Sequence, residues 1–230
     1  MADPDTIRGP IAFFDADETL LDLKSMLAFE AFYEGERPTI DPDRPRSEQN
    51  LLFWRRYRGR PVPRVRAVVV RWFVHLRAHL GDAIYRECAR AELERLQGQG
   101  FATVMVSGST PLLLEPFAAE LGIDHVVGTD LELEDGRFTG RVVGPVRTGD
   151  GKAAAVNDLC RAWGVDPRAC LACGDHPSDL PMLEAVGQAC IVPGNESMEA
   201  LARARGWRVL GTNAVPTAAR ETPSSTLEVS

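Results

Sequence analysis

The sequence contains no long apolar run and no secretion signal. None of its hydrophobic stretches reaches the roughly 18–20 residues that a membrane-spanning helix needs. The acidic start Met1–Asp5 lacks the basic region and the apolar stretch of a signal peptide. We therefore expect a cytoplasmic protein that does not interact with a membrane.

Basic residues are outnumbered as well. The 26 Lys and Arg residues stand against 33 Asp and Glu residues, which gives a formal net charge of -7 at pH 7. A general nucleic-acid binder needs a basic surface, so we expect no nucleic-acid partner. Nothing in the sequence indicates an obligate protein partner, and a local cluster of cations can still bind a small anionic substrate.

Cysteine is scarce. The five cysteines are odd in number and lie in apolar contexts, which favours reduced, buried thiols. Cys170 and Cys173 form a C-x-x-C pair without a second pair, which disfavours a zinc or redox site. His75 and His79, four residues apart on a predicted helix, lack a third ligand nearby and are expected to pack or to lie on the surface.

What the sequence does contain is a series of short apolar segments separated by helical patterns. This alternation predicts a doubly wound parallel α/β sheet. The stretch 126–143 differs, because the Asp135-Gly136 dipeptide between alternating runs predicts a hairpin of strands 126–134 and 137–143. The expected sheet strands are 11–14, 102–106, 170–173, 189–192 and 207–210.

A long helical stretch interrupts the alternation after the first strand. Between residues 21 and 97 the pattern is helical, broken by Pro- and Arg-rich loops at 37–46 and 58–64. We interpret this stretch as an inserted helical cap, and residues 1–20 and 98–212 as the α/β core. Residues 213–230, rich in Ser, Thr, Ala and Pro, are expected to form a disordered tail.

Paired carboxylates follow the first predicted strand. Asp15 and Asp17 are two residues apart at the end of the apolar run 11–14. Residues i and i+2 of a strand point to the same face, so the two carboxylates would converge. Convergent carboxylates hold a divalent cation or divide the roles of nucleophile and proton donor. The structural alternative is a pair of solvated acids in a turn.

Polar residues also follow two other predicted strands, at Ser107-Gly108 and at Gly174-Asp175. In a doubly wound sheet, ligands bind beyond the carboxyl ends of the strands, so these residues would meet Asp15 at one crevice. Each has a structural alternative when taken alone. Ser107-Gly108 could be an ordinary turn, and Asp175 and Asp179 could cap the helix that follows them. Lys152 could be a solvated charge at a helix start.

Taken in order, these segments form four motifs: Asp15-x-Asp17-x-Thr19, Ser107-Gly108, Lys152 and Gly174-Asp175-x-x-x-Asp179. The set resembles the haloacid dehalogenase superfamily of phosphohydrolases, over about residues 11–210. The long helical insertion after the first motif looks like the cap of the branch that contains phosphoserine phosphatase. The resemblance implies a magnesium-dependent phosphatase acting on a small phosphorylated metabolite.

The resemblance also implies a role for each motif residue. Asp15 would attack phosphorus and form an aspartyl-phosphate, and Asp17 would act as general acid and then as general base. Mg²⁺ would be held by Asp15, by the backbone carbonyl of Asp17 and by Asp175. Ser107, Gly108 and Lys152 would bind the phosphate group. Thr19 and Asp179 would support the site by hydrogen bonding.

The chain departs from the family pattern at several positions. Glu18 stands where the first motif often has glycine. Lys24 stands where phosphoserine phosphatases have a glutamate that binds the substrate ammonium, which argues against phosphoserine and for an anion or hydroxyls. In the arginine-rich part of the predicted cap, we expect Arg56 or Arg58 to reach the crevice and bind a second anionic group.

Two alternatives remain open at this point. A phosphotransferase or mutase of the same fold would differ only in whether water or another hydroxyl accepts the phosphoryl group. A non-catalytic protein that binds a phosphorylated ligand is the second alternative. A dehalogenase is disfavoured, because the proton donor Asp17 has no role in displacing a halide.

Overall fold

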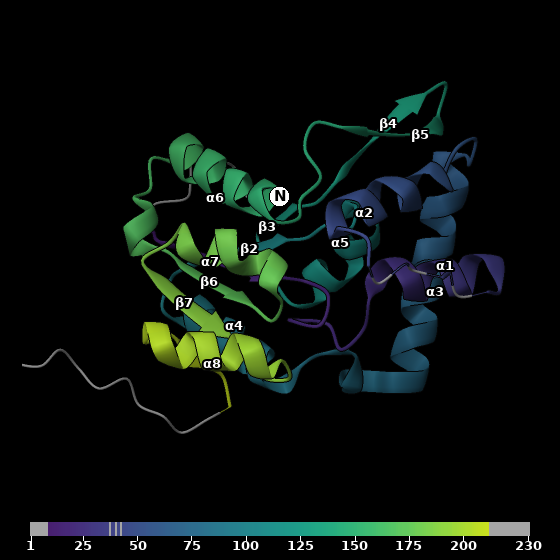
Figure 1. The fold of residues 1–230 in the computed structure, drawn as a ribbon. Helices are drawn as coiled ribbons and strands as arrows, with labels where there is room; N and C mark the ends of the chain where they lie inside the picture. Colours follow the sequence, from purple (N-terminus) through teal and green to yellow (C-terminus); the bar gives the residue numbers. More distant parts are fainter. Residues whose placement is uncertain (1–8, 37, 40, 42, 212–230) are drawn as a thin grey trace, which may run out of the picture.

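The structure, a computed structural model, describes residues 9–36, 38, 39, 41 and 43–211. Its centre is a six-stranded sheet in the order β3-β2-β1-β6-β7-β8, and all neighbouring strands are parallel (Figure 1). The doubly wound parallel sheet is thus confirmed, whereas the predicted tail lies outside the described residues. The strands are β1 (Ile11–Asp15), β2 (Ala102–Val106), β3 (His125–Val127), β6 (Leu171–Gly174), β7 (Gln188–Ile191) and β8 (Arg208–Val209).

Strand β1 lies at the point where the strand order reverses. All five of its residues are buried, because helices cover both faces of the sheet. Ile11 and Phe13 belong to one hydrophobic cluster, and Ala12 and Phe14 belong to the other. The alternation of a strand therefore divides one short apolar run between two cores. It also brings the end of β1 to the switch point of the sheet, where α/β proteins bind ligands.

Helices cover the two faces of the sheet. The cluster around Ile11 includes residues of α6 (Asp150–Trp163), α7 (Leu180–Glu184) and α8 (Glu196–Arg205). The cluster around Phe14 lies on the other face and includes residues of α4 (Glu87–Gly98), of α5 (Pro111–Glu120) and of the helical insertion. Short 3₁₀ turns are η2 (Gly81–Ile84), η3 (Pro167–Ala169) and η4 (Pro177–Asp179).

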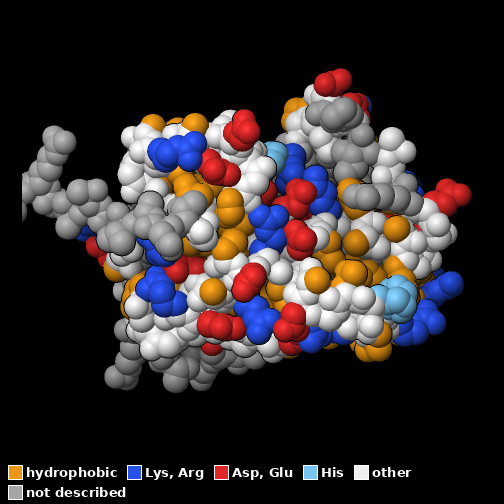
Figure 2. Space-filling model, turned by 90° about the horizontal axis from the view of Figure 1, so that it is seen from below, with side chains coloured by type: hydrophobic (Ala, Val, Ile, Leu, Met, Phe, Trp, Pro, Cys, Tyr) orange, Lys and Arg blue, Asp and Glu red, His pale blue; other side chains and the backbone are white. Residues whose placement is uncertain are grey.

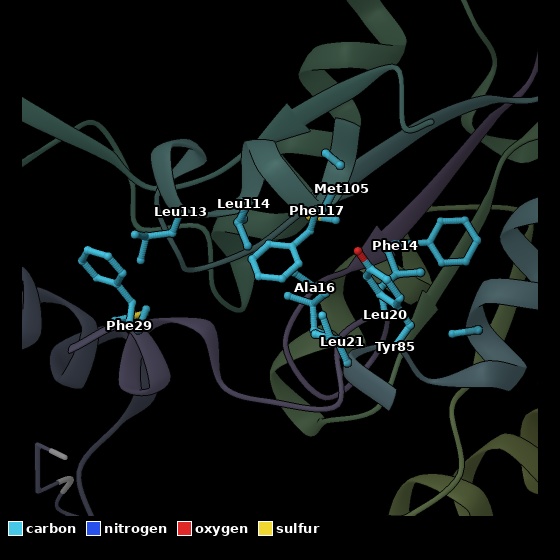
Figure 3. Close-up of a cluster of buried hydrophobic side chains, with 14 of the residues drawn as sticks. Phe14, Ala16, Leu20, Leu21, Phe29, Tyr85, Met105, Leu113, Leu114 and Phe117 are labelled. Carbon is cyan, nitrogen blue, oxygen red and sulfur yellow. The ribbon is translucent and has the colours of Figure 1, made fainter. Parts of the chain in front are cut away.

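Three helices of the insertion lie beside the sheet, to the right in Figure 1. Phe29 of α1 contacts Trp72 of α3, and Trp72 contacts Phe117 of α5, each with ring centroids 5.4 Å apart. Figure 3 shows Phe29 and Phe117 in the same apolar cluster as Leu21, from the loop after β1. The insertion therefore packs directly on the sheet domain. Its helices are α1 (Ser25–Glu34), α2 (Arg46–Arg55) and α3 (Val62–Leu80).

Helix α3 begins at Val62, inside the stretch 58–64 that was expected to be a loop. That expectation treated the prolines as helix breakers. Pro61 is the N-cap and Pro63 lies in the first turn, where a missing backbone N–H costs no intrahelical hydrogen bond. The prolines therefore start this helix instead of ending one.

One arginine of the arginine-rich segment, Arg60, has a structural role inside the insertion. Arg60 donates two hydrogen bonds to the fully buried Glu30, at 2.7 and 2.9 Å. Its guanidinium also lies over the rings of Tyr33 and Tyr57, at 4.4 and 4.6 Å from their centroids. Arg60 therefore neutralises a buried carboxylate of α1 and joins it to the end of α2.

The predicted hairpin forms, but its first strand is divided. Residues 125–127 pair with β2 in the main sheet as β3, and β4 (Asp130–Glu134) pairs with β5 (Arg137–Val143) through the Asp135-Gly136 turn. Gly128 lies between the two strands and packs closely on the backbone of Ser109, since a Cβ there would lie 2.4 Å from the carbonyl oxygen of Ser109. The expectation of one continuous strand from 126 to 134 was therefore wrong.

The expectation of reduced cysteines was wrong for one pair. Cys173 of β6 and Cys190 of β7 are joined by a disulfide. They face each other in register on adjacent parallel strands, a neighbourhood that their separation of 17 residues does not reveal. Cys88, Cys160 and Cys170 are free thiols.

The surface carries charges of both signs. On the face drawn in Figure 2, acidic and basic side chains are interspersed, and apolar side chains are scattered among them. In the described part of the chain, no helix is both long and apolar enough to cross a bilayer. His75 and His79 stack with ring centroids 4.0 Å apart, and no metal-ligand cluster among the described residues includes them.

Replacing Glu92 of α4 with glutamine is expected to lower the free energy of unfolding at pH 7 by about 1–3 kcal/mol. Glu92 is 4% exposed and accepts hydrogen bonds of 2.7 to 3.1 Å from Arg95 and from Arg208 of β8. Burial raises the pKa of Glu92, but the two arginines outweigh it and hold that pKa below its ordinary value of 4.5.

The sign of this pKa shift sets the pH dependence. A carboxylate with a lowered folded-state pKa stabilises the protein above its unfolded pKa, and this contribution is lost as the pH falls through the folded pKa. Urea unfolding at pH 7 and near pH 4 should therefore show a difference between parent and Glu92→Gln that shrinks at the lower pH. Glu87→Gln, an exposed change on the same helix, is the control. An equal difference at both pH values would contradict the assignment.

Candidate active site

The carboxyl ends of β1, β2 and β6 open into one cavity of about 880 Å³. Its wall combines residues from these strand ends with residues from α1, α2 and the segment between them. The predicted site residues on the wall are Asp15, Asp17, Lys24, Arg56, Ser107, Gly108 and Lys152. The other three predicted residues, Thr19, Asp175 and Asp179, lie behind the wall. Asp179 accepts hydrogen bonds from the wall residues Lys152 and His176, and Thr19 donates to Asp175.

Asp15 and Lys152 form the centre of the site. Lys152, in the first turn of α6, donates a short hydrogen bond to Asp15 Oδ1 and another of 2.6 Å to Asp179 Oδ1. Burial raises the pKa of Asp15 well above its ordinary value, against the opposing charge of Lys152. Burial lowers the pKa of Lys152, but Asp15 and Asp179 outweigh this and raise it, so the lysine is a cation. It is therefore a buried counter-charge, not a solvated residue.

Asp17 lies two residues further on and has separate partners. Its Oδ1 accepts a 3.0 Å hydrogen bond from the backbone N–H of Ser25, the first residue of α1. Burial raises the pKa of Asp17, although the hydrogen bonds from Ser25 oppose the rise. A carboxyl group whose pKa is raised in this way can exchange a proton nearer to neutral pH.

Thr19 and Asp179 orient the third acid. The Thr19 hydroxyl donates to Asp175 Oδ1 at 2.8 Å, which ties the loop after β1 to the loop after β6. Asp179 Oδ2 accepts the backbone N–H groups of Asp175 and His176, each at 3.1 Å. Both oxygens of Asp179 are thus engaged, one by this loop and one by Lys152.

Close packing explains the glycine before this acid. A Cβ at Gly174 would lie 2.7 Å from the Cβ and Oδ2 of Asp179, so a larger residue would displace the carboxylate that holds the loop. Asp179 therefore acts from behind the wall, and Gly174 lets it approach.

Three of these acids could hold a metal ion. Carboxylate oxygens of Asp15, Asp175 and Asp179 all lie within 4.8 Å of one another. Burial, and next the charge of Asp179, raise the pKa of Asp175 to about 6. Three carboxylates around one lysine leave an excess of negative charge that a hard divalent cation would neutralise, and oxygen donors are those that Mg²⁺ prefers. The residues present therefore fit Mg²⁺.

The end of β2 forms a tight turn at the wall. The Ser107 hydroxyl accepts a 3.1 Å hydrogen bond from the backbone N–H of Ser109. A Cβ at Gly108 would lie 2.4 Å from the side-chain nitrogen of Asn50 and 2.8 Å from Thr148. Side chains of α2 and of the loop before α6 thus both approach Gly108 closely. Asn50, Thr148 and Ser109 also line the wall, and they were not predicted because no local sequence pattern marks them.

Four cationic side chains from the insertion and its linker also reach the cavity, namely Lys24, Arg44, Arg46 and Arg56. Arg56 pairs with Glu30, with Nε 3.3 Å from Oε1. Arg58, the alternative to Arg56 in the sequence analysis, is not among the described wall residues and instead packs beside Gly140 of β5. Arg44 and Arg46 were not singled out from the sequence, because the run of arginines gives no sign of which face the cavity.

The chain is similar to proteins of a known family. The model of the haloacid dehalogenase-like hydrolases matches residues 12–184. A 99-residue segment is 41% identical to phosphoserine phosphatase SerB2 of Mycobacterium tuberculosis, covering 43% of this chain and 24% of that protein. The chain spans less than half of the length of the M. tuberculosis relatives that it matches.

Two further similarities extend over most of the chain. The Inhibition of morphological differentiation protein of Streptomyces azureus is 32% identical over 222 residues, which covers 86% of this chain and 77% of that protein. A crystal structure of a Bordetella pertussis Tohama I protein of unknown function has a TM-score of 0.71 at 21% identity, covering 87% of this chain and 97% of that one. The latter likeness concerns the fold alone.

Proposed function

The chain belongs to the haloacid dehalogenase-like hydrolases, and from this premise we propose that it is a phosphatase that hydrolyses a small phosphomonoester. The observation that carries the proposal is the convergence of Asp15, Asp17 and Lys152 on one cavity, with Asp175 and Asp179 directly behind them. The similarity to a segment of phosphoserine phosphatase SerB2 supports the same reaction class.

In the proposed reaction, Asp15 is the nucleophile. A side-chain oxygen of Asp15 attacks phosphorus, the bond from phosphorus to the ester oxygen breaks, and Asp17 gives its proton to the departing alkoxide. Asp17 then takes a proton from a water molecule, whose oxygen attacks phosphorus. This second step releases inorganic phosphate and restores the Asp15 carboxylate. The raised pKa of Asp17 supports its double role.

The same residues would hold Mg²⁺. We propose that Asp15, Asp175 and the backbone carbonyl of Asp17 bind it, while Asp179, whose oxygens are already engaged, positions Lys152 and the loop after β6. When bound, the ion would offset the repulsion between the Asp15 carboxylate and a substrate that carries about two negative charges.

Three further residues of the cavity wall would hold the phosphate group. The Ser107 hydroxyl and the Gly108 backbone N–H would donate to non-bridging oxygens, and Lys152 would add its positive charge. Lys152 would then serve both the nucleophile and the phosphate, because it already lies against Asp15.

The insertion would act as the cap. We propose that α1, α2 and α3, within residues 21–97, cover the α/β core, that α4 at the end of this stretch belongs to the core because it packs on the sheet, and that the cap selects the leaving group. Lys24 and Arg56 lie on the wall where a leaving group would extend. Their positive charge would repel the ammonium group of phosphoserine and favour an anionic or hydroxylated metabolite. Phosphoserine itself is therefore not the substrate we propose.

Phosphate release from p-nitrophenyl phosphate and from a panel of sugar, polyol, amino-acid and nucleoside phosphates tests the proposal. Transfer of phosphate to an added alcohol instead of water would favour the phosphotransferase alternative. Binding without release from any of these esters would favour a phospho-ligand-binding protein. Phosphoserine as the best substrate by a wide margin would contradict the argument from Lys24.

Asp17→Asn is expected to slow turnover of alkyl phosphates by about 10²–10⁴-fold. With p-nitrophenyl phosphate the variant should release about one equivalent of p-nitrophenolate and then stall, because that leaving group departs without a proton while the second step still needs a base. Stopped-flow absorbance measures the burst. Asp22→Asn, in the same loop but paired with Arg86, is the control. Unchanged steady turnover by Asp17→Asn would exclude the assigned role.

A further inference from the structure

Glu18 has an unusual backbone conformation for a residue with a side chain. Its φ angle is +64°, in the left-handed region that favours glycine, and among the described non-glycine residues only Asp135 shares a positive φ. Glu18 lies between Asp17 and Thr19, directly after the nucleophile strand. A strained conformation beside an active site points to a use for the side chain.

The Glu18 carboxylate lies between two cations of the cavity wall. Its Oε2 is 3.2 Å from Lys24 Nζ and 3.8 Å from a terminal guanidinium nitrogen of Arg46, the first residue of α2. Within the described residues, neither Lys24 nor Arg46 has another ion-pair partner. By contrast, Arg44 pairs with Asp41 and Glu48, and Arg56 pairs with Glu30.

The three side chains are open enough to exchange partners. Their exposed fractions are 41% for Glu18, 37% for Lys24 and 38% for Arg46. Ion pairs with this much exposure are weak and are screened by salt. Lys24 and Arg46 face the same cavity as Asp15, so an anionic group on a bound molecule could take the place of the Glu18 carboxylate.

We propose that Glu18 is a specificity-determining residue that occupies, from within the chain, an anion subsite formed by Lys24 and Arg46. The proposal rests on the phosphatase function proposed above and deepens it. The substrate class is a phosphomonoester whose leaving group carries a second anionic group, either a carboxylate or a phosphate. That group displaces Glu18, whereas a neutral leaving group leaves Glu18 in place.

A built-in competitor has a measurable consequence. The subsite is free only for the fraction of time in which Glu18 is released, and the apparent affinity for an anionic leaving group is reduced by that fraction. A neutral leaving group does not encounter this competition. Removing the Glu18 charge should therefore raise kcat/KM for anionic substrates relative to neutral ones. Removing a residue that binds the anionic group would instead lower it.

The effect of removing the Glu18 charge on anionic relative to neutral substrates distinguishes the proposal from a second role of the same ion pairs. Glu18 connects the loop after β1 to α2, so its ion pairs could simply hold the cap over the cavity. In that case removing its charge would weaken every substrate alike, whatever the charge of the leaving group. The ratio between matched substrates separates the two roles, because a change in cap position cancels in the ratio.

The test compares the parent with Glu18→Gln, which keeps the length of the side chain and removes its charge. Two substrate pairs differ in one anionic group: 3-phosphoglycerate against glycerol 3-phosphate, and fructose 1,6-bisphosphate against fructose 6-phosphate. We expect the ratio of kcat/KM, anionic over neutral, to rise by roughly three- to tenfold in at least one pair, the effect of one or two exposed ion pairs. The change should lie in KM.

The pair that responds identifies the chemistry of the second group. If the subsite binds a carboxylate, the ratio should rise more for 3-phosphoglycerate over glycerol 3-phosphate. If it binds a phosphate, the ratio should rise more for fructose 1,6-bisphosphate over fructose 6-phosphate. The rise should disappear when Glu18→Gln is combined with both Lys24→Gln and Arg46→Gln, because the competitor and the two cations that it pairs with are then all absent. Asp22→Asn removes one negative charge from the same loop without contact with Lys24 or Arg46, and its ratio should equal that of the parent.

An unchanged or lowered ratio in both pairs would overturn the proposal, and so would a rise that persists when both Lys24 and Arg46 are replaced. The same four compounds, titrated by calorimetry against Asp15→Asn with and without Glu18→Gln, give the ratio of dissociation constants without any turnover. Failure of the parent to hydrolyse any ester would remove the phosphatase function, while the binding ratio would still decide the role of Glu18.

Discussion

Asp15→Asn is expected to abolish phosphatase activity while the protein stays folded. Loss of a covalent nucleophile costs on the order of 10⁴–10⁶-fold in turnover. Asparagine has nearly the same shape as aspartate and leaves the 2.6 Å pair of Lys152 with Asp179 in place. It also removes one of three crowded carboxylates, so we expect no loss of thermal stability. Initial rates with p-nitrophenyl phosphate, together with melting curves, measure both effects.

A matched control separates chemistry from folding. Asp124→Asn also changes an acid to an amide, and its side chain accepts from the backbone and the hydroxyl of Thr103 on β2, outside the cavity. This variant should lose some stability and keep its turnover. In addition, the acid-quenched parent should carry a phosphoryl group on Asp15 that Asp15→Asn lacks. Turnover by Asp15→Asn at the parent rate would end the proposed mechanism.

Removing divalent cations is the second change with a large expected effect. In EDTA the parent should show no turnover and should melt at a lower temperature than in Mg²⁺, because a ligand that binds only the folded state stabilises it. At about 100 times its dissociation constant the ion would contribute about 2.7 kcal/mol, which corresponds to about 5–10 °C in a protein of this size. Differential scanning calorimetry measures the shift independently of activity.

The acid cluster explains this dependence. Burial raises the pKa of both Asp15 and Asp175, and neighbouring aspartates add to the rise although Lys152 opposes it. A bound cation would stabilise their charged forms. Asp175→Asn should remove most of the Mg²⁺-induced shift in melting temperature. Asp130→Asn, an exposed acid on the hairpin, should leave it intact. An identical melting temperature in EDTA and Mg²⁺, with full turnover in both, would exclude a metal at this site.

The elements that form the floor of the site could be predicted from short segments. The apolar run of β1 ends at Asp15, and β6 ends at Gly174-Asp175. Parallel strands in a doubly wound sheet all end at one edge, so local patterns suffice to bring these acids together. Lys152 is a different case. Taken alone, its position at a helix start indicates solvent exposure, and only its place among several motifs suggested a role in the site.

Which residues of the insertion line the cavity could not be predicted from such local patterns. Arg56 and Arg60 are four residues apart, are chemically alike and both pair with Glu30, yet Arg56 lines the cavity and Arg60 packs against two tyrosine rings. The path of the chain after α2 and the positions of Glu30 and Tyr33 on α1 set this difference. Neither is visible from the spacing of the arginines.

Sequence by itself determined where the chain makes strands, which acids follow them and therefore which reaction class to expect, because strand alternation and strand ends depend on residues that are near one another in the chain. Tertiary structure decided the rest. It pairs Cys173 with Cys190, divides the strand at Gly128, and places Glu18 between Lys24 and Arg46. Each of these depends on segments that are brought together by packing, whose contacts no local pattern encodes.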